Sequence, residues 1–146
     1  MAQLKNTHVF TFCDEVNNGA IVTVGHNRQA RTERETLLNG DEVRRVRCYL
    51  HGHNVATFSQ TWYKAPGGFD HDPRAVDVEL DACGYLTTTT RAAMNDFLGA
   101  MRINGSASVA RGELSARYMG LDAQYHDIGG KYGATSLFFV AARRAR

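Results

Sequence analysis

Apolar and polar residues alternate over residues 42–50 (EVRRVRCYL). Val46, Cys48 and Leu50 fall on one face of an extended chain, and Arg45, Arg47 and Tyr49 fall on the other. After a turn at residues 51–54, the segment 55–63 (VATFSQTWY) is rich in aromatic and β-branched residues. The two segments predict an antiparallel β-hairpin with one buried face.

The same period of two recurs in residues 76–82. It predicts a strand with Val76, Val78, Leu80 and Ala82 inside, and an acidic solvent face made of Asp77, Glu79 and Asp81. Residues 89–103 change to a helical period, because Met94, Phe97, Leu98 and Met101 form one apolar stripe. We therefore expect a helix over 89–103, ended by Asn104-Gly105.

The remaining segments predict further short elements. Asn18-Gly19 is a typical two-residue turn, so residues 8–25 predict a hairpin, as do residues 106–119. A last strand is expected over 137–141, and the segments 64–75 and 122–133 are expected to be loops. Residues 27–40 fit either a short helix or a long loop, because Thr32 and Glu35 match a capping box and Gly40 matches a helix stop.

Consecutive hairpins imply an antiparallel sheet with the main helix packed on one face, which is an α+β fold of seven or eight strands. The 146 residues, 43% of them hydrophobic, fit a single domain over 1–146, with residues 1–7 and 142–146 expected to be mobile. The net charge of +2 does not by itself imply a nucleic-acid partner.

Three cysteines at distant positions, Cys13, Cys48 and Cys83, indicate reduced thiols in a cytoplasmic protein. The first residues lack the apolar segment of a signal peptide, and the longest apolar run, residues 137–142, is too short to span a bilayer. We expect no membrane partner and no cofactor.

The segment from Cys48 to Leu98 carries a distinctive pattern. A hairpin with Tyr49-Leu50-His51-Gly52-His53-Asn54-Val55-Ala56 is followed by Gly84-Tyr85-Leu86-Thr87-Thr88-Thr89-Thr90-Arg91 and then by Asn95. This resembles a group of small proteins of tailed bacteriophages whose strand-to-helix junction reads Gly-Trp-x-Thr-x-Thr-Thr-Arg, with an Asn four residues after the Arg. Tyr85 replaces the Trp here. The resemblance implies a phage origin and a compact α+β fold, and it supplies no activity.

The start of the predicted helix is a candidate site for an anionic ligand. Its free N–H groups and the positive end of its dipole favour anions, and the hydroxyls of Thr88, Thr89 and Thr90 and the guanidinium of Arg91 could add contacts. Lys131 lies in a glycine-rich segment (Gly129-Gly130-Lys131) that could close over such a ligand. The bland alternative is a threonine cap beside a solvated arginine.

The sequence offers two other candidate sites. Arg44, Arg45 and Arg47, together with Trp62, could bind single-stranded nucleic acid through charge and base stacking, although solvated arginines are the commoner case. His51, His53 and His71 could hold a transition metal, but histidines in turns are more often solvent-exposed side chains that bind no metal.

These features favour a non-enzymatic phage accessory protein that binds an anionic ligand or a host protein. The ligand would be nucleic acid, or a nucleotide-like immune signal that the protein sequesters. The alternatives are a metal-dependent hydrolase and a virion or assembly protein whose strands pair between subunits, and a homo-oligomer fits several of these possibilities.

Overall fold

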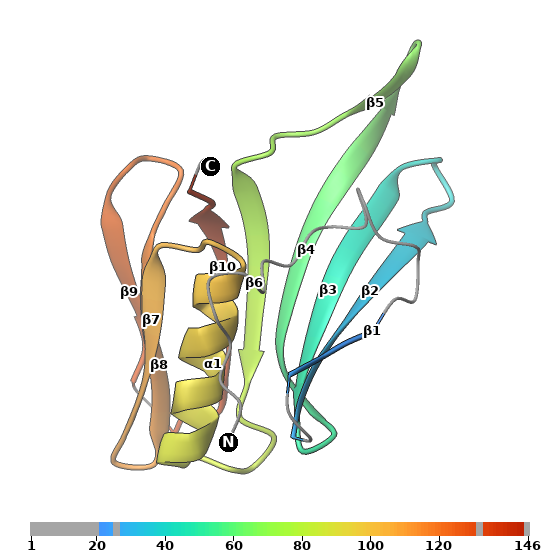
Figure 1. Ribbon diagram of the computed structural model, residues 1–146. Helices are drawn as coiled ribbons and strands as arrows, with labels where there is room; N and C mark the ends of the chain where they lie inside the picture. Colours follow the sequence, from blue (N-terminus) through green and yellow to red (C-terminus); the bar gives the residue numbers. More distant parts are fainter. Residues whose placement is uncertain (1–20, 25–26, 131–132, 145–146) are drawn as a thin grey trace.

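The computed structural model describes residues 21–24, 27–130 and 133–144 of the chain, and Figure 1 shows its elements. One helix and ten strands are present in these residues. In chain order they are β1 (Ile21–Val24), β2 (Arg28–Thr36), β3 (Glu42–Leu50), β4 (His53–Ala65), β5 (Gly68–Asp70), β6 (Ala75–Asp81), α1 (Thr88–Ala100), β7 (Gly105–Ala110), β8 (Glu113–Met119), β9 (Tyr125–Gly129) and β10 (Ser136–Ala142).

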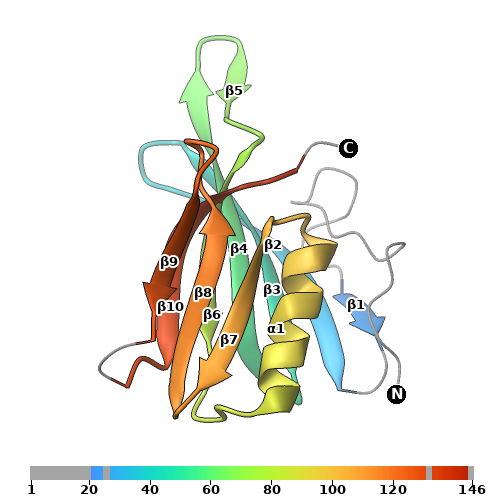
Figure 2. The same ribbon diagram turned by 90° about the vertical axis from the view of Figure 1, so that its left-hand side faces the viewer.

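The elements form two layers. The first is a large antiparallel sheet with the order β1-β2-β3-β4-β6-β10, and β5 pairs with the far end of β4. The second layer consists of α1 and a small sheet of the order β7-β8-β9. Figures 1 and 2 show α1 and the small sheet side by side, together covering one face of the large sheet. The predicted α+β fold, with hairpins and one helix on a sheet face, is confirmed.

Strand alternation gives the large sheet an inner face toward α1 and an outer face away from it. The predicted inward residues Val46, Cys48, Val78 and Leu80 are buried. They pack with the apolar stripe of α1, in which Met94, Phe97, Leu98 and Met101 are also buried. One core therefore lies between the layers, and the predicted stripe of the helix is confirmed.

The segment 28–36 is a strand, so both expectations for it, a helix capped at Thr32 or a loop, are wrong. The cause is long-range pairing with β3, which outweighs a local capping signal. Glu33 lies opposite Arg45, and its carboxylate contacts the guanidinium groups of Arg45 at 3.5 Å and of Arg47 at 2.8 Å. The charges that suggested a polar helix or loop are thus cross-strand ion pairs.

Two expected loops contain short strands, β5 and β9, which pair with the neighbouring strands β4 and β8. Residues 8–12 and the expected turn at Asn18-Gly19 lie outside the described residues, and the expected return strand is present as β1. Of the tail expected to be mobile, residues 142–144 are described and contact the rest of the fold. Ala142 ends β10, the Arg144 N–H donates to the Arg102 carbonyl at 2.8 Å, and the backbone therefore stays bound to the fold there.

The helix begins one residue before the predicted start and ends three residues before the predicted end. Its two sides are attached to different elements. The buried Arg28 of β2 forms an ion pair with Asp96. On an adjacent side of the helix, the Asn95 amide accepts the Ala107 N–H at 2.7 Å and donates to the Ala107 carbonyl at 3.1 Å. Asn95, the last residue of the phage-like pattern, therefore joins the helix to the small sheet. None of the described helical segments is both long and apolar enough to cross a membrane.

Replacing Asn95 by alanine removes both hydrogen bonds and leaves a partly buried backbone amide without a partner. We expect the free energy of unfolding of the Asn95→Ala variant to fall by about 1–3 kcal/mol in urea denaturation. Arg91→Ala, on the exposed side of the same helix, is the control and should change it by no more than about 0.5 kcal/mol. Equal stabilities of the two variants would contradict the proposed role of Asn95.

Candidate functional site

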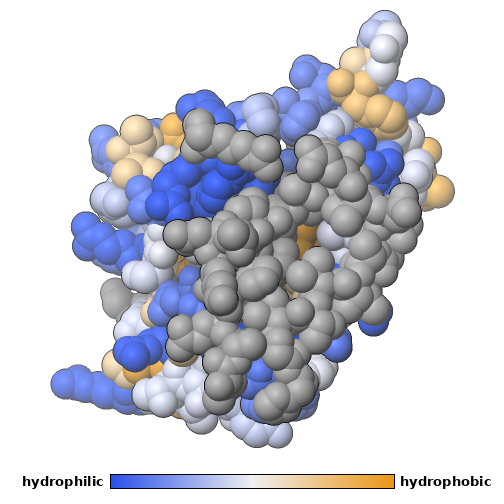
Figure 3. Space-filling model, in the orientation of Figure 1, coloured by the Kyte–Doolittle hydropathy of each residue, from blue (hydrophilic) through white to orange (hydrophobic). Residues whose placement is uncertain are grey.

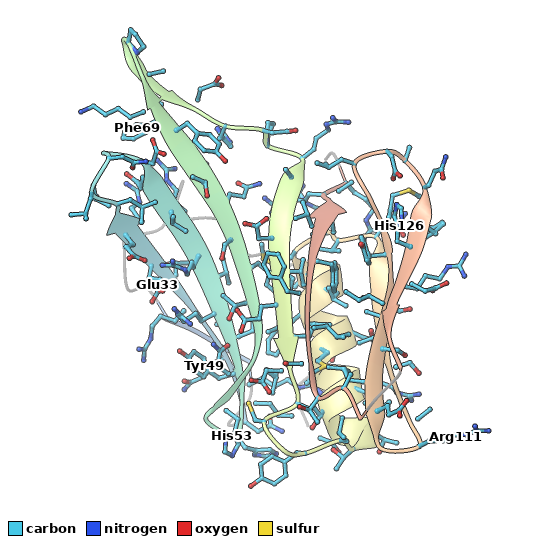
Figure 4. The ribbon with its side chains drawn as sticks, turned by 180° about the vertical axis from the view of Figure 1, so that it is seen from behind. Glu33, Tyr49, His53, Phe69, Arg111 and His126 are labelled. Carbon is cyan, nitrogen blue, oxygen red and sulfur yellow. The ribbon has the colours of Figure 1, made fainter. Side chains whose placement is uncertain are left out.

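A pocket of about 350 Å³ opens at the end of the molecule where α1 begins. This volume lies within the range of small-molecule sites. The pocket is bounded by the turn between β3 and β4 on one side, and by the connection from β6 to α1 on the other. Its lining residues are Leu50, His51, His53, Val55, Ala82, Tyr85, Thr87, Thr89 and Thr90. Figure 4 labels His53, which lies at this end of the large sheet.

Sheet register brings these segments together. Ala56 of β4 pairs with Leu80 of β6, so the turn before β4 and the connection after β6 emerge at the same end of the sheet. The turn is tight, because Leu50 pairs with His53 across only two residues. His51 and Gly52 both have left-handed backbone angles, with φ of 50° and 80°. These angles match the twist of a two-residue hairpin and fix the position of both histidines beside the pocket.

The wall opposite the histidines is the start of α1. Thr87 is the N-cap residue, and its hydroxyl accepts the Thr90 N–H at 3.2 Å. No backbone or side-chain partner among the described residues accepts the N–H groups of Thr88 and Thr89. The first turn of the helix also carries no acidic residue. These N–H groups and the helix dipole make this wall attractive to an anion.

Two aromatic rings stand at the mouth of the pocket. The ring of His53 lies 5.1 Å from that of Tyr85, centroid to centroid, and the planes are tilted by 44°. Tyr85 is 55% exposed although it is large and aromatic. An exposed ring next to a concave surface can bury itself against a flat ligand, and such contacts add binding energy beyond the buried area.

Cys83 is adjacent to this site but is not primed for nucleophilic chemistry. Burial raises the pKa of its thiol, and the nearby negative charge of Asp81 raises it further. The thiol also lies 3.4 Å from the Asn54 carbonyl, toward which it can donate. A thiol held in its neutral form is a weak nucleophile. Cys48 is fully buried in the core, and burial raises its pKa as well.

The structure therefore joins parts of two predicted sites. Thr89 and Thr90 line the pocket together with His51 and His53, whereas Thr88, the first residue of α1, does not line it. Arg91 is exposed and does not line the pocket, and Lys131 lies outside the described residues.

The predicted metal constellation is not assembled. His71 stacks on Trp62 near the other end of β4, with 3.9 Å between ring centroids. His51 lies in the turn before the same long strand, and His53 is the first residue of that strand. Within residues 21–24, 27–130 and 133–144, no group of three or more His, Cys, Asp or Glu side chains could hold a metal ion.

The predicted nucleic-acid site is divided between the two faces of the large sheet. Arg45 and Arg47 lie on the outer face, while Arg44 and Trp62 lie on the inner face. Trp62 is only 5% exposed, and its ring is covered by Arg44, whose guanidinium lies 4.1 Å from the ring centroid. Arg45 and Arg47 are paired with Glu33. Trp62 is therefore not available for base stacking.

Sequence reasoning missed two features of the site. It did not identify Tyr85 as a site residue, and it did not predict that the histidines and the threonines line the same pocket. The available signal was that all of these residues belong to the phage-like pattern, in its hairpin and in its strand-to-helix junction. Searches against protein-family models, curated proteins and solved structures gave no match to this chain.

Proposed function

We propose that this protein binds a small ligand that combines an anionic group with a flat ring, as a nucleotide does, in the pocket at the start of α1. The single observation that carries the proposal is that one concave site is lined both by the start of α1, where the Thr89 N–H group has no partner among the described residues, and by the exposed Tyr85. A phosphate needs the first feature and a nucleobase uses the second.

The two parts of the ligand would lie against opposite walls. The phosphate would accept hydrogen bonds from the N–H groups of the first helical turn and from the Thr89 hydroxyl. The side chain of His51, in the turn, would stand across from it as a further donor. The base would cover Tyr85 and His53 at the mouth of the pocket. The nearby Cys83 thiol would not act as a nucleophile toward this ligand, because burial and the charge of Asp81 raise its pKa.

A pocket ligand is favoured over a nucleic-acid strand because the four residues predicted for strand binding are divided between the two faces of the sheet and do not form one surface. A strand needs a continuous basic groove with exposed rings, whereas Trp62 is buried on the face opposite Arg45 and Arg47. In the phage setting that the resemblance implies, a protein of this kind would sequester a nucleotide-like signal of the host.

Calorimetric titration with adenosine monophosphate, guanosine monophosphate, adenosine and inorganic phosphate tests the proposal. We expect at least one nucleotide to bind more tightly than both the nucleoside and phosphate, because only the nucleotide engages both walls. Tyr85→Ala should raise the dissociation constant about 10-fold or more, since stacking on an aromatic side chain contributes about 1–3 kcal/mol per base.

The matched control is Tyr125→Ala, which removes another exposed tyrosine, on β9 of the small sheet. It should leave the affinity unchanged. The proposal is wrong if no nucleotide binds, or if Tyr85→Ala and Tyr125→Ala bind equally well. Binding of single-stranded DNA that is lost in an Arg45→Glu/Arg47→Glu variant would support the nucleic-acid alternative instead.

A further inference from the structure

The outer face of the large sheet carries ion-paired arginines on one side and, on the other, carboxylates that have no cationic partner among the described residues. Figure 4 looks onto this face and labels Glu33 on β2 and Tyr49 on β3. Neighbouring side chains form transverse rows, because the strands pair in continuous register. One row is Arg47, Thr57, Glu79 and Phe138, and the next is Arg45, Ser59, Asp77 and Val140.

In both rows a base on β3 and an acid on β6 flank the central strand β4. The outward residues of β4 in these rows are the short Thr57 and Ser59, so the long charged side chains stand on either side of a low central strip. On β6, the carboxylates of Asp77, Glu79 and Asp81 have no cationic side chain within 4.0 Å among the described residues. On the other side, the arginines Arg31, Arg45 and Arg47 outnumber the outward carboxylates Glu33 and Glu35 by one.

We propose that two copies of this chain associate through their outer faces, related by a two-fold axis that runs along β4. Rotation by 180° about such an axis exchanges β3 with β6 and keeps each residue at its height along the strand. Arg45 of one copy then faces Asp77 of the other, and Arg47 faces Glu79. The symmetry repeats both pairs, as an isologous interface requires.

The dimensions of packed sheets fit this arrangement. Face-to-face sheets lie about 10 Å apart, a gap that an arginine and a facing carboxylate can span. The short side chains of β4 lie nearest the axis and permit close approach. Because sheets twist, packed sheets cross at about 30°. Facing residues therefore stay closest to register near the centre of the interface, where the rows that contain Arg45 and Arg47 lie. The same rotation places Arg31 over the exposed ring of Phe138, where a cation–π contact adds attraction.

The environment of Asp77 is consistent with a missing cationic partner. Partial burial raises the pKa of its carboxyl group. Its charged form is therefore disfavoured in the isolated chain, and a facing guanidinium would offset that cost. This association uses a different surface from the ligand pocket, and it can be true or false independently of the proposed ligand.

Sedimentation equilibrium of the full chain tests the dimer. We expect the wild-type protein to dimerise and its dimer to weaken as salt rises, because salt screens the facing charges. Arg45→Glu/Arg47→Glu and Asp77→Lys/Glu79→Lys each place like charges opposite one another, so each should weaken the dimer about 100-fold or more. Mixing the two charge-reversed variants restores opposite charges at every pair, and a heterodimer should form.

A second measurement covers the case in which a charge-reversed variant does not fold. Ser59→Cys places a thiol close to the two-fold axis, so a short bis-maleimide should cross-link two copies more than it does the wild-type chain. Ser108→Cys, on the small sheet, is the control and should not show this increase. A monomeric wild-type protein, a dimer unaffected by charge reversal, mixed variants that stay apart, or equal cross-linking at both positions would overturn the proposal.

Discussion

Replacing Phe97 by alanine will lower the free energy of unfolding by about 3–5 kcal/mol. Phe97 is completely buried on the inward side of α1, where it is one of the largest side chains in the core between the layers. Its removal loses the transfer free energy of the ring, and it leaves a cavity that the sheet and helix can fill only in part. Urea denaturation followed by circular dichroism measures the change.

The same chemical change at Phe69 is the control. Phe69 is 49% exposed on β5, at the projecting end of the β4–β5 hairpin that Figure 4 labels, and Figure 3 shows apolar surface at this end. We expect Phe69→Ala to cost about 1 kcal/mol or less, since it opens no cavity. If the two variants lose similar stability, the core does not lie between the helix and the large sheet as described.

Replacing Gly129 by alanine will lower the free energy of unfolding by about 2–4 kcal/mol. Gly129 ends β9 with φ of +78°, a left-handed conformation that costs a residue with a Cβ about 1–2 kcal/mol. A Cβ at this position would also lie 2.4 Å from the Leu114 carbonyl oxygen and 2.6 Å from Leu137 Cδ2. The backbone of β8 and a core leucine of β10 would therefore have to move.

Gly133 provides a matched control for this prediction. Its φ of +67° is also left-handed, but a Cβ there would meet no atom within 4 Å. Gly133→Ala should therefore show the conformational cost without the clash. Thermal or urea unfolding of both variants separates the two contributions, and a Gly129→Ala variant no less stable than Gly133→Ala would contradict the close packing of β9 against β8 and β10.

The elements that the sequence predicts well are those whose own residues carry the signal. Alternation identifies β3 and β6, aromatic and β-branched residues after a turn identify β4, and the apolar stripe identifies α1. β2 has only Arg28, Ala30 and Thr32 as its buried inward residues. Its strand conformation depends on pairing with β3, and that pairing is not visible in a local pattern. β5 and β9 are short strands at the ends of hairpins and owe their existence to a neighbour in the same way.

In the candidate site, too, single residues carry a local sequence signal, whereas their arrangement depends on long-range pairing. The threonines at the start of the helix and the two histidines of the turn are each recognisable as polar groups at special backbone positions. Their meeting depends on the register between β4 and β6, which the sequence does not specify. Alternation does separate Arg45 and Arg47 from Val46 and Cys48, and the same parity places Arg44 on the inner side. The same alternation, applied to the strand that contains Trp62, would have placed Trp62 on the other face from Arg45 and Arg47.

The most direct test of the central claim is to map a nucleotide onto the protein by solution NMR. Titration with adenosine monophosphate should shift the backbone amide signals of Thr88, Thr89 and Thr90 and the side-chain signals of His51, His53 and Tyr85. Signals from the outer face, such as those of Arg45 and Glu79, should stay unchanged at constant protein concentration. Shifts confined to the outer face, or no shifts at all with every nucleotide tried, would contradict a ligand site at the start of α1.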